Sequence, residues 1–196
     1  MMKCFEETLR VISDSIRSIR AEDFDALTQD CLDVLAGGGK VVASGLGKNV
    51  PICEKFVGTL NSVGVPAAFM HTNSAVHGDL GIVRDGDLVI VLTKSGETSE
   101  SVYLVRLLKQ RECRIWLLSF SRDSALCRAL ENRLILDLEH EGDEWNVLPN
   151  NSTVLNLIVL QELAMRLVKS RKVPVDVLRR NHPGGDIGAR LGGTAK

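Results

Sequence analysis

The sequence is poor in aromatic side chains and has almost no net charge. Phe, Trp and Tyr make up 4% of the 196 residues, and the formal net charge is −1. A protein that stacks nucleobases needs exposed aromatic rings, and one that binds nucleic acid or an anionic membrane needs an excess of positive charge. The composition therefore argues against both classes of partner.

Long apolar runs are also missing. No stretch approaches the roughly 18 apolar residues of a membrane-spanning helix, and the N-terminal sequence MMKCFEETLR has no apolar segment typical of a signal peptide. The five cysteines form no CxxC pair, and their odd number favours reduced thiols. We therefore expect a cytoplasmic protein without a membrane partner.

The apolar sequence that is present is sufficient for one core. Hydrophobic residues make up 44% of the chain, and its length is that of a single domain. We predict one domain over 1–196, with an N-terminal helical segment (1–39), an α/β core (40–170) and a C-terminal segment (171–196). The glycine and proline content of the last segment is typical of a frayed tail.

Short β-branched runs alternate with helical apolar patterns along the core. Strands separated by helices predict an α/β fold with a parallel sheet and helices on both faces. Such sheets bind ligands beyond the carboxyl ends of their strands. We predict strands at 40–44, 67–70, 88–92, 114–119 and 134–138, and helices within 5–35 and at 51–63, 98–110, 124–130 and 152–169.

The most informative turn follows the third predicted strand. Ser95, Gly96 and Thr98 lie between that strand and a helix N-terminus, where free backbone N–H groups and the helix dipole favour an anion. A phosphate is the anion that such a turn fits best. Two carboxylates, Glu97 and Glu100, accompany the turn and hint at chemistry beside the phosphate, although acids in a first helical turn are also favoured by the dipole alone.

A second glycine-rich turn follows the first predicted strand. It contains Ser44, Gly45, Gly47 and Lys48, so that backbone can approach a ligand closely and a cation stands beside it. The spacing matches neither a Walker loop nor a dinucleotide fingerprint. A tight turn with a solvated lysine is the alternative interpretation.

Four further segments carry groups suited to acid–base chemistry or to anion binding. His71 and His77 follow the second strand, where a histidine can move protons or merely cap a turn. The segment 139–145 holds four carboxylates and a histidine, and one of those carboxylates could have a pKa raised by burial near Trp145. Residues 150–153 open the long helix and offer a second anion site. The motif 181–188, with a histidine beside Pro-Gly-Gly, suggests a tail that folds over a cleft.

These motifs, in this order, resemble the sugar isomerase (SIS) domain family, and most specifically its D-arabinose-5-phosphate isomerases. The resemblance implies a three-layer SIS fold with a five-stranded parallel sheet flanked by helices. It also implies a homodimer or homotetramer with sites between subunits, and no metal or organic cofactor. The matching stretches are SGLGK (44–48), HTNSAVHGDLG (71–81), SGETSE (95–100), LPNNST (148–153) and NHPGGDIGARL (181–191).

The resemblance implies a phosphosugar site in which D-ribulose 5-phosphate and D-arabinose 5-phosphate are interconverted through an enediolate. The C-terminal histidine of the family reaches into a neighbouring subunit. The catalytic positions fall on Lys48, His77, Glu100, Glu141 and His182, and the substrate-binding positions on Ser44, Gly45, Gly47, Ser95, Gly96, Thr98, Ser152 and Thr153.

Such a reaction needs a base at the C1/C2 carbons and a group that stabilises the enediolate oxygens. We expect Glu141 or a histidine to transfer the C1/C2 proton. Glu100 and His182 would assist ring opening or proton exchange between hydroxyls, and Lys48 would stabilise the oxyanion or the phosphate.

The sequence departs from the family pattern at three places. Lys94 stands where the family usually has a small polar residue, and residues 142–145 replace an Ala-Cys-Pro-type sequence. Lys94 could meet an additional anionic group of the substrate, or pair with Asp87 or Glu97. Many family members carry two CBS domains after the SIS domain, which this sequence lacks, so any regulatory input would be absent or on another chain.

Two other functions remain open. The chain could be a non-catalytic sugar-phosphate sensor, or another SIS enzyme such as a hexulose-phosphate isomerase or a phosphosugar lyase. Its first forty residues lack a basic recognition helix, which argues against DNA binding by the chain itself.

Overall fold

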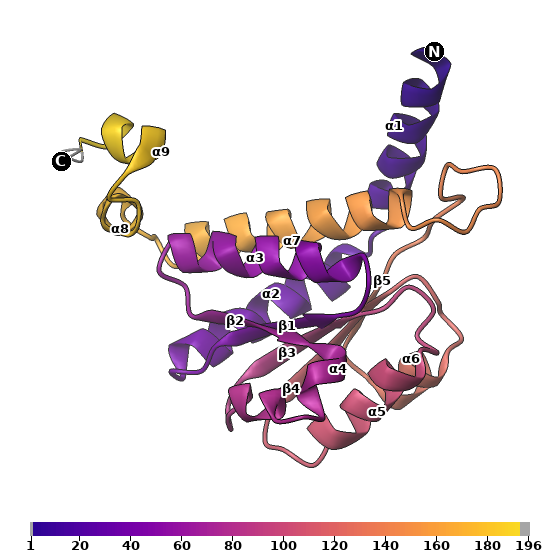
Figure 1. Cartoon of the computed structure of the whole chain (residues 1–196), viewed down its shortest axis with the longest axis horizontal. Helices are drawn as coiled ribbons and strands as arrows, with labels where there is room; N and C mark the ends of the chain where they lie inside the picture. Colours follow the sequence, from indigo (N-terminus) through magenta and orange to yellow (C-terminus); the bar gives the residue numbers. More distant parts are fainter. Residues whose placement is uncertain (1, 193–196) are drawn as a thin grey trace.

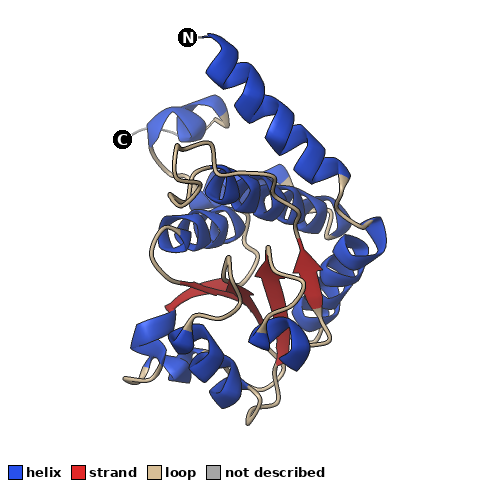
Figure 2. Ribbon diagram, turned by 90° about the vertical axis from the view of Figure 1, so that its right-hand side faces the viewer, coloured by secondary structure: helices blue, strands red, loops and turns tan. Residues whose placement is uncertain are grey.

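The computed structural model describes residues 2–192 and has three layers, helix, sheet and helix (Figures 1 and 2). The predicted α/β fold with a five-stranded parallel sheet flanked by helices is confirmed. The strands are β1 (Val41–Gly45), β2 (Ala67–His71), β3 (Leu88–Leu92), β4 (Arg114–Ser119) and β5 (Arg133–Ile135). The helices are α1 (Met2–Arg17), α2 (Ala21–Ala36), α3 (Asn49–Ser62), α4 (Thr72–Ala75), α5 (Ser99–Leu108), α6 (Ala125–Ala129), α7 (Asn151–Ser170), α8 (Val175–Asn181) and α9 (Gly185–Arg190), with a 3₁₀ turn η1 (Asp79–Ile82).

The strand order is β2-β1-β3-β4-β5, and every neighbouring pair is parallel. Gly45 at the end of β1 lies opposite His71 of β2 and Leu92 of β3. The carboxyl ends of these three strands are therefore level. The loops that follow them leave from one edge of the sheet, which is where a ligand site is expected.

Both faces of the sheet are buried, which explains the unbroken apolar sequence of β3. Leu88, Ile90 and Leu92 pack with residues of α2, α3 and α7, whereas Val89 and Val91 pack with residues of α5 and α6. This division follows from the period of two along a strand. Figure 1 shows α3 and α7 on one side of the sheet and α5 and α6 on the other.

Helix α1 projects from the rest of the molecule (Figures 1 and 2). Its inner end is anchored because Val11 and Ile12 are buried. Near its outer end, Phe5 and Leu9 are 66% and 68% exposed. The helix thus presents an apolar face that residues 2–192 of one chain do not cover.

The described part of the C-terminal segment forms α8 and α9, although its composition is typical of a frayed tail. The side-chain amide of Asn181 donates hydrogen bonds to the carbonyls of Asn61 and Ser62 at the end of α3. Val177 packs closely against Gly64. These are long-range contacts that composition alone cannot reveal.

The last strand is shorter than predicted. Ile135 pairs with Ser119, and the N–H of Leu136 still donates to the Ser119 carbonyl. Since β4 ends at Ser119, residues 136–138 have no neighbouring strand to pair with.

Among the described residues, none of the helices has both the length and the apolar character to cross a bilayer.

Candidate functional site

The turn between β3 and α5 leads into a helix whose start has no side-chain cap. The hydroxyl of Ser95 is exposed and accepts a hydrogen bond from the N–H of Glu97. Thr98 is the N-cap of α5, yet its side chain makes no capping bond. The start of the helix is therefore accessible to a negatively charged group. Glu100 lies in the first turn of this helix. Its carboxylate accepts bonds from its own N–H and from the hydroxyl of Ser99, which lowers its pKa.

Two other residues fix this turn to α6. Gly96 has φ +68° and packs so tightly that a Cβ there would lie 2.8 Å from Cβ of Ser124. Glu97 accepts a 2.7 Å hydrogen bond from the N–H of Ala125, the first residue of α6. Glu97 therefore caps α6 rather than its own helix, which the sequence did not indicate.

The turn after β1 brings α3 close to the sheet. A Cβ on Gly45 would lie 2.9 Å from Cβ of Asn49 and 3.2 Å from Sγ of Cys53, so only glycine fits without a shift of α3. Gly47 has φ +54° and Lys48 is exposed at the N-cap of α3. Ser44, by contrast, is fully buried and its hydroxyl pairs with that of Thr72 at 3.0 Å.

The two histidines that follow β2 differ in their contacts. His71 is the N-cap of α4, and its Nδ1 accepts a hydrogen bond from the N–H of Asn73. This is the turn-capping role that the sequence allowed. His77 is exposed in the loop between α4 and η1, so its ring is accessible to solvent.

Glu141 is the one buried carboxylate that the β5–α7 loop contributes, with no exposed surface. Oε2 accepts hydrogen bonds from the N–H groups of Asn150 (3.0 Å) and Ser152 (2.9 Å), and Oε1 lies 2.5 Å from Nζ of Lys94. Burial by itself raises the pKa of Glu141, but the Lys94 ammonium and the hydrogen bonds from Ser152 and Asn150 outweigh it, so that the pKa is lowered.

The sequence allowed a carboxylate with a raised pKa in 139–145, but the pKa of Glu141 is lowered and so is that of Asp143. At the α7 N-terminus, which the sequence offered as a second anion site, the N–H groups of Asn150 and Ser152 bond to the carboxylate of Glu141. The hydroxyl of Thr153 donates to the carbonyls of Pro149 and Asn150.

Asp143 orders the rest of the loop. Its carboxylate accepts hydrogen bonds from the N–H groups of Trp145, Val147 and Leu148. These bonds lower the pKa of Asp143 although burial opposes them. Residues 143–148 therefore form a compact loop held by one side chain.

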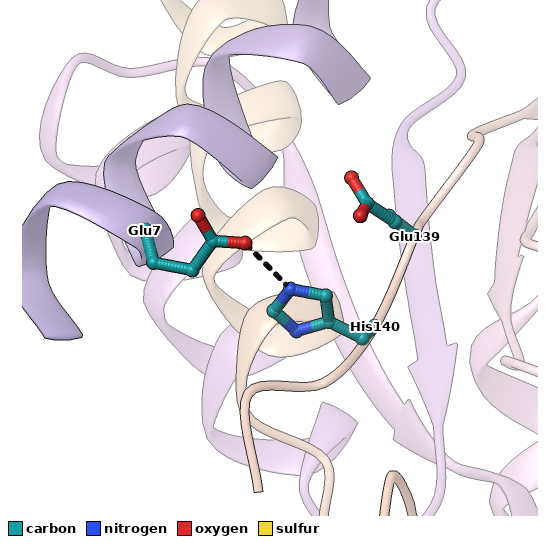
Figure 3. Close-up of side chains that lie close together, drawn as sticks. All are labelled: Glu7, Glu139 and His140. Carbon is teal, nitrogen blue, oxygen red and sulfur yellow. Dashed lines mark hydrogen bonds and ion pairs between the residues drawn. The ribbon is translucent and has the colours of Figure 1, made fainter.

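Three groups that resemble metal ligands lie beside this loop. Figure 3 shows Glu7 of α1 facing Nε2 of His140, with Glu139 nearby. The guanidinium of Arg10 donates to both carboxylates, at 2.7 and 2.8 Å. Bonds from Arg10 and His140 lower the pKa of Glu7 to about 2. Since Arg10 already supplies the positive charge, we interpret the cluster as an ion-pair network that attaches α1 to the loop.

The other predicted catalytic histidine lies elsewhere. His182 follows α8, and its Nδ1 is 2.8 Å from the carbonyl of Leu178. Helix α8 is attached to the C-terminal end of α3, whereas Lys48 lies at the N-terminal end of this 14-residue helix. At 1.5 Å per residue, the two ends are about 21 Å apart. Within one chain, His182 is therefore remote from the edge of the sheet that carries the other candidates.

The remaining candidate residues do lie at one edge. The loops after β1, β2 and β3 start side by side, and the loop after β5 reaches back across β4 to place Glu141 against Lys94. A hollow of about 490 Å³ is lined by Lys94 and Ser95 together with residues of the β5–α7 loop. The sequence analysis singled out Lys94 and Ser95 of this hollow but not Phe120, which also lines it. It did not predict the contact between Lys94 and Glu141 either, because no local pattern reveals it.

The comparisons with known proteins agree on one family. The SIS domain model matches residues 35–166. The chain is 33% identical over 186 residues to the arabinose 5-phosphate isomerase KdsD of Pseudomonas aeruginosa, covering 95% of this chain and 57% of the relative. It is 37% identical over 153 residues to KpsF of Escherichia coli, also an arabinose 5-phosphate isomerase, covering 78% of this chain and 48% of the relative. The chain thus spans about half the length of the curated relatives it matches.

A solved structure is similar over nearly the whole chain. It is a protein of Escherichia coli CFT073 in complex with arabinose 5-phosphate, 30% identical, with a TM-score of 0.86. The superposition covers 93% of this chain and 95% of that one.

Proposed function

The chain belongs to the SIS domain family, and we propose that it is a phosphosugar aldose–ketose isomerase that interconverts D-ribulose 5-phosphate and D-arabinose 5-phosphate, or a close analogue. The observation that carries the proposal is the proximity of two features. An open anion site, at Ser95 and Thr98, borders the same edge of the sheet as the ionised carboxylate of Glu141. The relatives named arabinose 5-phosphate isomerase, and the related structure in complex with that sugar phosphate, support the choice of sugar.

In the proposed reaction, the phosphate binds at the start of α5 and fixes the short sugar chain. A base removes the proton at C2 of the aldose, which gives an enediolate. A proton returns at C1 while the O2 proton moves to O1, so that the ketose has the same atoms as the aldose. We assign the C1/C2 proton transfer to Glu141, whose lowered pKa keeps it ionised at neutral pH, or to a histidine.

The other candidate residues have supporting roles in this proposal. Lys48 neutralises the enediolate or the phosphate, as its exposed ammonium at the start of α3 allows. Glu100 and His182 assist ring opening or proton exchange between hydroxyls. His77, Gly45, Gly47 and the residues of the β3–α5 turn complete the proposed site. No metal or cofactor takes part.

We also propose a homodimer or homotetramer in the cytoplasm, in which the α8–α9 segment of one subunit supplies His182 to the site of another. Two observations support this arrangement. His182 is remote from the other candidates in its own chain, and α1 has an uncovered apolar face at Phe5 and Leu9.

The test is to incubate the protein separately with ribulose 5-phosphate, arabinose 5-phosphate and a set of hexulose and hexose phosphates, and to follow each by NMR. Interconversion of the two pentose phosphates supports the proposal. Turnover of hexose phosphates alone would identify another SIS enzyme, and binding without turnover of any sugar would identify a sensor.

A further inference from the structure

Lys94 and Glu141 join two loops that are separated by a strand. Lys94 follows β3, Glu141 follows β5, and β4 lies between them in the sheet. Their side chains meet at 2.5 Å between Nζ and Oε1. The carboxylate is fully buried, whereas the lysine side chain is 42% exposed. The pair therefore lies at the protein surface, with the carboxylate buried and the lysine side chain partly exposed to solvent.

Every other polar atom of Glu141 has a partner. Its N–H donates to Oδ1 of Asn146, its carbonyl accepts from the N–H of Asn151, and Oε2 accepts from Asn150 and Ser152. Oε1 makes no hydrogen bond of normal geometry and has only the ion pair with Lys94. Oε1 is therefore the one oxygen of this carboxylate that can act on a ligand, and Lys94 covers it.

The backbone of Lys94 is also fixed. Its carbonyl accepts hydrogen bonds from the hydroxyl of Ser119 (3.1 Å) and from the N–H of Phe120 (3.1 Å). Lys94 and Ser95 both line the hollow of about 490 Å³ at this edge. The ammonium group thus lies between the buried carboxylate and the space next to the anion-binding turn.

We propose that Lys94 is a positioning residue of the site: its ammonium, which borders the hollow beside Ser95, keeps the buried carboxylate of Glu141 ionised and fixes Oε1 behind it. The inference rests on the proposed function, because it gives Glu141 a part in proton transfer. A carboxylate without a cation in this place would be protonated more readily, because burial disfavours its charged form.

Most other charged groups on the elements around Glu141 already have partners. On α1, Glu7 and Arg10 bind His140 and Glu139 of the loop. Asp143 is occupied by backbone N–H groups of its own loop. Glu144 is a further acid of this loop, and the first turn of α7 carries no charged side chain. Lys94 is therefore the cation that sets the charge balance at Glu141.

The chain contains a matched control pair at the opposite edge of the sheet. Nζ of Lys40 lies 2.5 Å from Oδ2 of Asp87, whose side chain is 3% exposed. Lys40 precedes β1 and Asp87 precedes β3, so this pair lies at the amino ends of the strands. It has the same chemistry and length, but it is far from the proposed site.

The experiment is a pH profile of kcat/KM with arabinose 5-phosphate, from about pH 4 to pH 9, for wild type, K94M, K94Q, K94R and K40M. On the acidic side of the profile, kcat/KM falls as the catalytic base becomes protonated; we call this part of the curve the acid limb. Loss of the cation in K94M and K94Q should shift the acid limb to higher pH by roughly one to three pH units. K94R keeps the charge and should keep the wild-type limb. K40M should lower the Tm but leave the acid limb of the kcat/KM profile at the wild-type pH. An acid limb unchanged in both neutral Lys94 variants would overturn the inference.

A second readout does not need turnover. The carboxyl carbon of Glu141 can be titrated by ¹³C NMR, with E141Q to assign its signal. In K94M its midpoint should rise relative to wild type, and an unmoved midpoint would contradict the pairing. If wild type turns over no sugar phosphate, the proposed function fails and the catalytic part of this inference fails with it. If wild type is active and the K94M and K94Q profiles match it, the inference alone fails.

Discussion

Glu97 accepts a 2.7 Å hydrogen bond from the backbone N–H of Ala125, so that a residue of the β3–α5 turn caps α6, the helix that follows β4. The bond connects the β3–α5 turn to α6. It also distinguishes the roles of the two carboxylates of the turn. Glu97 holds the N–H of Ala125, whereas Glu100 lies at the start of α5 and bonds to the hydroxyl of Ser99.

Glu97→Ala should lower the free energy of unfolding by about 0.5 to 2 kcal/mol, the usual cost of a lost helix cap. Glu97→Gln retains an acceptor oxygen and should lie close to wild type. Urea unfolding monitored by circular dichroism measures both. Equal stability of the alanine variant and wild type would contradict the capping role.

Glu100→Gln should affect activity and not stability, in contrast to Glu97→Ala. The carboxylate is exposed, so stability should change little, whereas kcat should fall by about 10²-fold or more if Glu100 assists proton exchange. Steady-state kinetics with arabinose 5-phosphate measures the loss, with Glu97→Gln as the control from the same turn. A kcat equal to that of the control would remove Glu100 from the proposed mechanism.

Gly96→Ala should destabilise the protein by roughly 2 to 4 kcal/mol, because the new methyl group would overlap Ser124 and the backbone has φ +68°. Gly58 is the matched control. It lies in α3 with no heavy atom within 4 Å of an added Cβ, so Gly58→Ala should stabilise by about 0.5 to 1 kcal/mol. Thermal unfolding of the two variants should give shifts of opposite sign, and shifts of the same sign would contradict this account.

The ionised state of Glu141 should contribute to stability in a defined pH range. Its pKa is lower in the folded state than the ordinary value of 4.5. That contribution is fully present above the unfolded-state pKa and is lost as pH falls through the folded-state pKa. The stability difference between wild type and Glu141→Gln should therefore narrow as pH falls below about 4.5. Urea titrations at neutral and acidic pH measure it, and a difference independent of pH would be inconsistent with an ion pair.

Shared sites between subunits predict complementation. His182→Ala and Glu100→Gln should each be nearly inactive alone. After unfolding and refolding together, some mixed dimers would contain one site with neither substitution, and about a quarter of the wild-type activity should return. Mixtures that stay as inactive as the separate variants would show that His182 does not act in a neighbouring subunit.

Local patterns predicted the sheet and its edge, but not the partnerships across it. The apolar run Leu88–Leu92 predicted β3, and the Ser95–Thr98 turn predicted an anion site, because both signals lie in consecutive residues. The sequence left open whether Lys94 meets an additional anionic group of the substrate or pairs with Asp87 or Glu97. In the structure Asp87 pairs with Lys40, and Lys94 pairs with Glu141.

The pairing of Lys94 with Glu141 could not be predicted because the two residues are far apart along the chain. Lys94 and Glu141 are brought together by the order of β3, β4 and β5, which residue spacing does not encode. The same holds for the tail, where the contact of Asn181 with the end of α3 stabilises a segment whose composition is typical of disorder.

The central claim is that the chain moves a proton between C1 and C2 of a pentose phosphate. It is tested most directly by incubating wild type and Glu141→Gln with arabinose 5-phosphate in deuterium oxide and recording the NMR spectra. We expect ribulose 5-phosphate carrying solvent deuterium at C1 with wild type, and bound but unconverted sugar with Glu141→Gln. Binding of the sugar by wild type without conversion, or full activity of Glu141→Gln, would contradict it.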